Sequence, residues 1–189
     1  AAMNKLTKLC KRADQKLQLK QDNRFKRLQE NVGKAVPVFR EQAVANALAS
    51  LAVDNKPLLL ALCNRAKHAH ISRQLSPQGC ANIIWSLTTL SHRDEQLLKL
   101  LIQRFEQILT KQPDEVQPQN VSNALWGVSL LELAAPSLFA AASTFPLSRL
   151  ADFKPQHIGN TALAFARFGI KDEQLFSGLM QQLDKRFSE

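Results

Sequence analysis

Apolar residues recur at steps of three and four along most of this chain. After Asn82 they stand at positions 83, 84, 85, 87 and 90, and after Asn123 at positions 124, 125, 126, 128, 130 and 131. Such spacing places them on one side of an α-helix. A second apolar pattern follows each stretch, over residues 94–109, 136–139 and 172–187. Alternation at period two never persists, so the pattern predicts helical hairpins and no sheet.

A short polar motif precedes these first helices and occurs four times. Each copy holds Gln four residues before Asn, and the Asn residues lie 36, 41 and 37 positions apart. In three copies Pro precedes the Gln, and Pro suits the first turn of a helix because its missing N–H is not needed there. Ser76 is placed to cap its copy. A period of this size is typical of stacked helical repeats.

The pattern therefore predicts an all-α fold, a right-handed α-solenoid of stacked helical hairpins with about four repeats of 36–41 residues. Residues 1–34 are predicted to form a basic amphipathic helix that could end a preceding repeat. Residues 35–189 are predicted to form the four hairpins, over 38–73, 74–114, 115–151 and 152–189. Because the first residue is Ala and no polar cap is evident after Phe187, we expect a processed chain or a piece of a longer array.

Positive charge is concentrated at the start of the chain. Residues 1–34 carry ten Lys and Arg against three acidic residues, whereas the whole chain has a formal net charge of +9. Three interpretations of this segment stay open: a solvated or capping helix, a surface that contacts nucleic acid, and the remnant of an organelle-targeting leader.

Motifs that support catalysis are not found in the sequence. It has no Gly-rich phosphate loop, no nucleophile elbow and no Cys/His pattern with zinc spacing. His68 and His70 would point to different sides of a helix, while His92 and His157 fall in a hairpin loop and at a helix start. We therefore expect no enzyme, no metal, no cofactor and no small-molecule substrate.

Compartment signals are limited. The longest unbroken apolar stretch, residues 58–63, is far shorter than the roughly twenty residues that a bilayer requires, so no membrane span is expected. The three cysteines are widely spaced and form no Cys-x-x-Cys pair, which fits a reducing compartment.

The repeated polar residues have two interpretations. Stacked hairpins would align the four Asn side chains into a ladder, which could bond neighbouring helices or an extended ligand. We favour the structural role because a buried amide needs a partner, and for the same reason we assign the Gln residues to helix capping. Trp85 and Trp126 lie three residues beyond an Asn, and packing between hairpins is favoured over base stacking for them.

The segment Pro118–Trp126, reading PQNVSNALW, and its near copy Pro77–Trp85 resemble the octotricopeptide repeat, a paired-helix unit of about 38 residues. The resemblance extends from about Val38 to the C-terminus. It implies an RNA-binding factor of mitochondria or chloroplasts that acts in RNA processing, translation or ribosome assembly. Its implied partners are RNA, with ribosomal RNA as one candidate, and other ribonucleoprotein subunits.

Such a factor would contact RNA through a basic concave surface. Helical-repeat readers take roughly one base per repeat, while Lys and Arg attract phosphate. The predicted RNA-binding residues are Lys5, Lys8, Lys11, Arg12, Arg40, Asn46, Lys67, Arg73, Asn82, Arg93, Asn123, Lys154, Asn160 and Arg167.

The alternative function is a protein-binding scaffold, such as a helical-repeat bacterial effector. The two functions differ in where the basic side chains project. Lys and Arg on the same face as the Asn ladder would favour RNA, whereas a neutral face would favour a protein partner.

Overall fold

The computed structural model describes residues 18–19, 21–51, 55–145 and 147–187, and every regular element in these ranges is helical. The prediction of an all-α fold is therefore confirmed for this part of the chain. The first described helix, α3 (Asn23–Ala35), is capped by Asp22, whose carboxylate accepts a hydrogen bond from the N–H of Arg24. In the described ranges no helix combines the length and apolar character that crossing a membrane would take.

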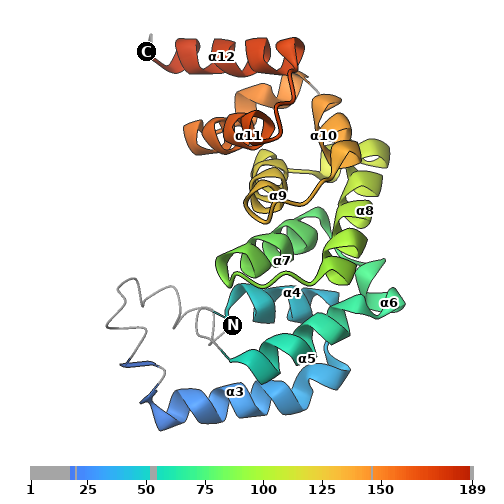
Figure 1. The fold of residues 1–189 in the computed structure, drawn as a ribbon, viewed down its shortest axis with the longest axis vertical. Coiled ribbons are helices and arrows are strands. Elements are labelled where there is room, and N and C mark those ends of the chain that lie inside the picture. The colour runs from blue at the N-terminus through green and yellow to red at the C-terminus, as the bar shows by residue number, and fades with distance from the viewer. Residues whose placement is uncertain (1–17, 20, 52–54, 146, 188–189) are drawn as a thin grey trace.

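Pairs of helices follow α3 along the chain, ending with α12 at the opposite end of the molecule (Figure 1). Each pair lies within one predicted repeat, while the repeat boundaries and the right-handed course stay predictions. The bounds are η1 Val36–Val38, α4 Glu41–Ala49, α5 Lys56–Lys67, α6 Ala69–Ser72, α7 Pro77–Thr89, α8 Glu95–Lys111, η2 Pro113–Glu115, α9 Pro118–Leu130, α10 Pro136–Ser143, η3 Leu147–Asp152, α11 Pro155–Arg167 and α12 Glu173–Phe187.

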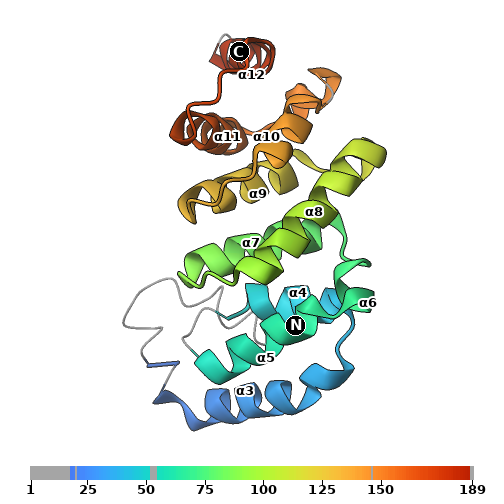
Figure 2. The ribbon, with the colours of Figure 1, turned by 45° about the vertical axis from the view of Figure 1, so that its right-hand side comes forward.

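The first helices of the pairs pack against one another in chain order. Helix α4 contacts α7, α7 contacts α9, and α9 contacts α11. Figure 2 shows α7, α9 and α11 one above another. We call α4, α7, α9 and α11 the first layer, and α5, α8 and α10, which contact one another in the same order, the second layer. Most apolar residues of the first-layer helices are buried against neighbouring helices, as the helical spacing predicts, whereas Trp85, Leu130 and Leu163 are exposed.

Three hairpin turns share one backbone geometry. After the C-caps of α7, α9 and α11 the next residue has a positive φ, which ends the helix, and the N–H that follows donates to a carbonyl five residues back, a Schellman motif. The left-handed residues are Ser91, Glu132 and Gly169, with φ of 50°, 53° and 63°. The donors that follow them are His92, Leu133 and Ile170. Only Gly169 adopts this conformation without steric cost.

A second recurrent contact closes the open end of each of the first three hairpins. An arginine from the second half of the unit donates to the backbone carbonyl two residues before the first helix, and we call this contact the arginine clasp. The three clasps are Arg65 to Phe39 at 3.0 Å, Arg104 to Leu75 at 3.1 Å and Arg149 to Val116 at 2.8 Å.

A glycine allows α9 to approach α7 closely. A Cβ atom on Gly127 would lie 2.7 Å from Cγ2 of Ile84 and 3.1 Å from Oγ1 of Thr88. The Thr88 hydroxyl also donates to the Gly127 carbonyl at 3.2 Å. Because Ile84 is fully buried, it has little room to move away.

We expect Gly127→Ala to lower the free energy of unfolding by about 1–2 kcal/mol, because the added methyl overpacks the contact between α7 and α9. Urea denaturation followed by circular dichroism measures the change. Gly159→Ala is the matched control, since nothing lies within 4 Å of a Cβ there and alanine favours the helix. Equal effects of the two substitutions would contradict the close-packing account.

Candidate nucleic-acid interface

The repeated motif places its polar residues on one side of the first layer. Positions four, seven and eleven residues beyond each motif Gln share a side of the helix with it. In the described ranges all of these side chains are exposed or half-buried, whereas the opposite sides of the same helices are buried. We call this surface the amide face. It consists of Gln42, Asn46 and Ala49 on α4, Gln78, Asn82, Trp85 and Thr89 on α7, Gln119, Asn123, Trp126 and Leu130 on α9, and Gln156, Asn160, Leu163 and Arg167 on α11.

The amides do not bond neighbouring helices. Nε2 of Gln42 donates to Oδ1 of Asn46 at 3.0 Å, within α4. The side chains of Asn82, Asn123 and Asn160 make no hydrogen bond to any residue that the structure describes. The structural interpretation of the Asn ladder is therefore wrong: because these amides reach solvent, water can satisfy them and no neighbouring backbone is needed.

The motif glutamines do not cap their helices either. Ser76 caps α7 as predicted, accepting from the N–H of Gly79 at 3.1 Å. In α9 the side chain of Asn120 accepts from the N–H of Gln117 at 3.1 Å. Because Gln78 and Gln119 lie one residue after the leading Pro, they point away from the cap and onto the amide face.

The tryptophans differ in exposure. Trp85 is 38% exposed, so the predicted packing between hairpins is wrong for this residue. Trp126 is half-buried, and the guanidinium of Arg167 lies 5.8 Å from its ring centroid in a cation–π contact. Both rings lie on the amide face because each Trp is three residues beyond its Asn, a spacing that stays on the exposed side of the helix.

The centre of the amide face is uncharged. Helices α7 and α9 contain no Lys, Arg, Asp or Glu, and Arg167 brings positive charge to the α11 end of the face. Arg40 and Lys154 are exposed at the N-caps of α4 and α11, so they flank the face at its two ends.

The structure places the other predicted basic residues elsewhere. Nζ of Lys67 pairs with Asp94 at 2.9 Å and Arg93 pairs with Glu95 at 3.2 Å, both beside the turn between α7 and α8. Arg73 is exposed at the end of α6. Four more predictions, Lys5, Lys8, Lys11 and Arg12, lie outside the described residues. Of the predicted RNA-binding residues that the structure describes, the Asn residues and Arg167 lie together on the amide face. The other cations lie on several different surfaces.

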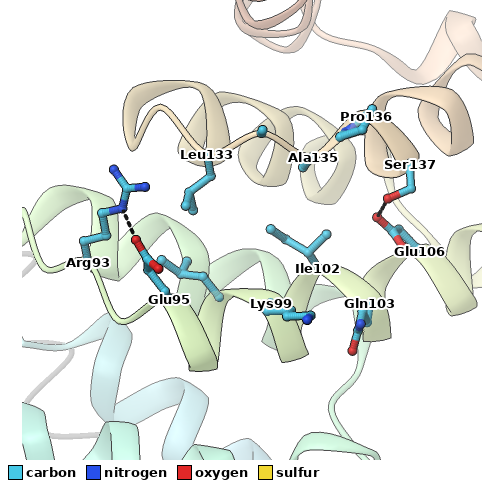
Figure 3. Close-up of a pocket in the computed structure, with 12 residues that line it drawn as sticks. Arg93, Glu95, Lys99, Ile102, Gln103, Glu106, Leu133, Ala135, Pro136 and Ser137 are labelled. Atoms are coloured by element: carbon cyan, nitrogen blue, oxygen red, sulfur yellow. Dashed lines mark hydrogen bonds and ion pairs between the residues drawn. The ribbon is translucent and has the colours of Figure 1, made fainter.

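A cavity of about 420 Å³ lies between α8 and the start of α10, on the second layer (Figure 3). Ile102 and Leu133 contribute apolar walls, and Lys99 and the pair of Arg93 with Glu95 line it with charge. Oγ of Ser137 donates to Glu106 at 2.7 Å at one end.

One group of potential metal ligands could not be recognised from a motif in the sequence. Cys63, His92 and Asp94 come from α5, the turn after α7 and the N-cap of α8, and their ligand atoms lie within 4.8 Å of one another. Burial raises the pKa of the Cys63 thiol to about 12. Cys63 stands 29 positions before His92, so no local motif could reveal the group.

Comparison with known proteins identifies the family. A protein-family profile described as RNA-editing substrate-binding complex 6 protein matches residues 7–184. No curated protein matches the chain significantly. Because the profile spans nearly the whole sequence, the chain belongs to the family of the RNA-editing substrate-binding complex 6 protein.

Proposed function

We propose that this chain is a non-enzymatic, RNA-binding subunit of an RNA-editing complex of mitochondria, and that its amide face contacts single-stranded RNA. Membership of a family named for an RNA-editing substrate-binding complex supports the assignment. The family lends no support to a chloroplast location or to ribosomal RNA as the partner. The likeness to octotricopeptide repeats and the right-handed solenoid remain part of this proposal.

The chemistry of the amide face suits unpaired bases. Amide groups both donate and accept hydrogen bonds, so Asn and Gln can pair with base edges that a single strand leaves open. Exposed aromatic rings stack on bases, and Trp85 offers such a ring. The observation that carries the proposal is that the amides of Asn82, Asn123 and Asn160 are accessible and make no hydrogen bond to a described residue.

Phosphate attraction would come from the ends of the face. Arg167 lies on the face, and Arg40 and Lys154 flank it at the N-caps. Positive charge at these places would hold the backbone of a strand whose bases lie over the neutral centre.

We expect Trp85→Ala to weaken binding of a fluorescein-labelled single-stranded RNA by roughly tenfold, because base stacking on an aromatic ring contributes about 1–3 kcal/mol. Fluorescence anisotropy at fixed salt concentration measures the affinity. Leu60→Ala is the matched control, since Leu60 is 45% exposed on α5 of the second layer. Unchanged affinity in Trp85→Ala, or an equal loss in Leu60→Ala, would remove the amide face from the RNA contact.

A protein partner is the second candidate, and the uncharged centre formed by α7 and α9 favours it. Helical repeats commonly hold peptides or helices along such surfaces. If wild-type protein shows no RNA affinity even at low salt, where phosphate attraction is strongest, the scaffold function gains.

A further inference from the structure

The residues of the turn between α7 and α8 differ in kind from those of the next turn. In the Schellman motifs, the residue after the left-handed position is His92 in one hairpin and an apolar residue, Leu133 or Ile170, in the other two. This position ordinarily makes an apolar contact with the preceding helix turn. An imidazole therefore stands where the neighbouring repeats place a hydrocarbon side chain.

The residues around His92 also differ from their equivalents in the next repeat, and the arginine clasps show which residues are equivalent. Cys63 precedes clasp residue Arg65 by two positions, as Ile102 precedes clasp residue Arg104. By the spacing of the repeats, Asp94 corresponds to Ala135 in the next unit. Figure 3 shows Ile102, Leu133 and Ala135 around the cavity of that next unit. The group of Cys63, His92 and Asp94 thus replaces an apolar trio with three potential metal ligands.

The three side chains lie close enough together for one metal ion to contact all of them. The ligand atoms of Cys63, His92 and Asp94 lie within 4.8 Å of one another. Nε2 of His92 is buried and has no hydrogen-bond partner among the described residues, which is costly for a polar atom. Oδ1 of Asp94 caps α8 by accepting from the N–H of Leu97 at 3.0 Å, so the carboxylate is fixed in place.

We propose that Cys63, His92 and Asp94 bind a zinc ion that fastens the first hairpin to the second. Sulfur, imidazole nitrogen and carboxylate oxygen are the ligands zinc prefers, at roughly 2.0–2.3 Å, and a water completes the tetrahedron. Ligand atoms at such a site stand about 3.5 Å apart, so the three atoms, which lie within 4.8 Å of one another, need move together by no more than about 1.3 Å. On binding, Cys63 releases its proton to solvent and coordinates as a thiolate.

Lys67 competes with the metal. Its ammonium is 2.9 Å from Oδ2 of Asp94 and must leave that oxygen when zinc binds. Partial burial acts to raise the pKa of Asp94, but the hydrogen bonds from Lys67 and Leu97 outweigh it and the pKa is lowered. The carboxylate thus already pairs with a cation, the ammonium of Lys67. Replacing Lys67 with a neutral residue should favour the metal.

Cobalt(II) titration of chelator-treated protein tests the site, because a thiolate ligand produces a sulfur-to-cobalt charge-transfer band. We expect the band in wild type and in Cys80→Ala, whose cysteine is equally buried but stands apart from the group. The band should disappear in Cys63→Ala and in His92→Leu. The second substitution introduces leucine, the residue at the equivalent position 133 of the next repeat. Zinc should displace the cobalt and raise the melting temperature of wild type and of Cys80→Ala, but not of Cys63→Ala or His92→Leu.

Lys67→Gln gives an independent readout that requires no ligand to be removed. It should bind cobalt about tenfold more tightly, because a like charge next to the ion is lost. Absence of the band in wild type, or its persistence in both Cys63→Ala and His92→Leu, would overturn the proposal. Circular dichroism verifies that each variant keeps its helix content, and His92→Leu covers the case in which Cys63→Ala does not fold.

Discussion

Replacement of Phe165 by alanine is expected to lower the free energy of unfolding by about 3–5 kcal/mol, the range typical of a buried phenyl group. Phe165 is fully buried in α11. Its ring meets Phe139 of α10 edge to face at 5.0 Å between centroids, and Phe176 of α12 at 5.9 Å. One side chain therefore joins three helices, and its removal leaves a cavity between them.

Urea denaturation monitored by circular dichroism measures this loss. Leu163→Ala is the control, because Leu163 lies two residues away in the same helix and is 54% exposed. It should change stability by less than about 0.5 kcal/mol, as surface substitutions do. In a stacked array the helices at one end can open without the rest, so hydrogen exchange should locate the effect in α10 to α12. Similar losses in the two variants would show that Phe165 is not the centre of this cluster.

Arg104→Met is expected to lower the free energy of unfolding by about 1.5–3 kcal/mol, the contribution of a hydrogen bond with a charged partner. Methionine keeps the apolar stem but cannot donate to the carbonyl of Leu75, which Nε of Arg104 meets at 3.1 Å. Leu75 is buried, so water cannot readily replace the lost donor. The start of α7 would then lose its attachment to α8.

Thermal and urea unfolding measure the effect, with Lys99→Met as control in the same helix. Lys99 is exposed on α8, so its substitution removes a charge but no clasp. Lys99→Met should be nearly neutral. If Arg104→Met is equally neutral, the clasp does not stabilise the fold, which would contradict this prediction.

The sequence allowed the helices and the repeated face to be predicted because both depend on local spacing. Helix α9 begins at Pro118 and α8 begins directly after Asp94, close to where the pattern places the helix starts. The equivalence of the four Asn residues also followed from the period. Their role did not, because the exposed or buried state of Asn82 depends on which side of α7 the neighbouring helices cover.

Contacts between distant residues could not be predicted. Packing between hairpins is predicted for Trp85 because apolar residues surround it in the sequence, yet its side chain is exposed. The partner of Arg104 is 29 residues away and is a backbone atom, which leaves no trace in residue types. The group of Cys63 and His92 likewise appears only when two repeats are packed together.

The arginine clasp has a consequence for how such chains change in length. The arginine follows its carbonyl by 26, 29 and 33 residues in three successive hairpins. The same closure is therefore reached by hairpins of unequal size. Insertions and deletions inside a hairpin should be tolerated wherever one arginine still returns to that carbonyl, so an array of this kind can acquire uneven repeats without losing the packing of its first layer.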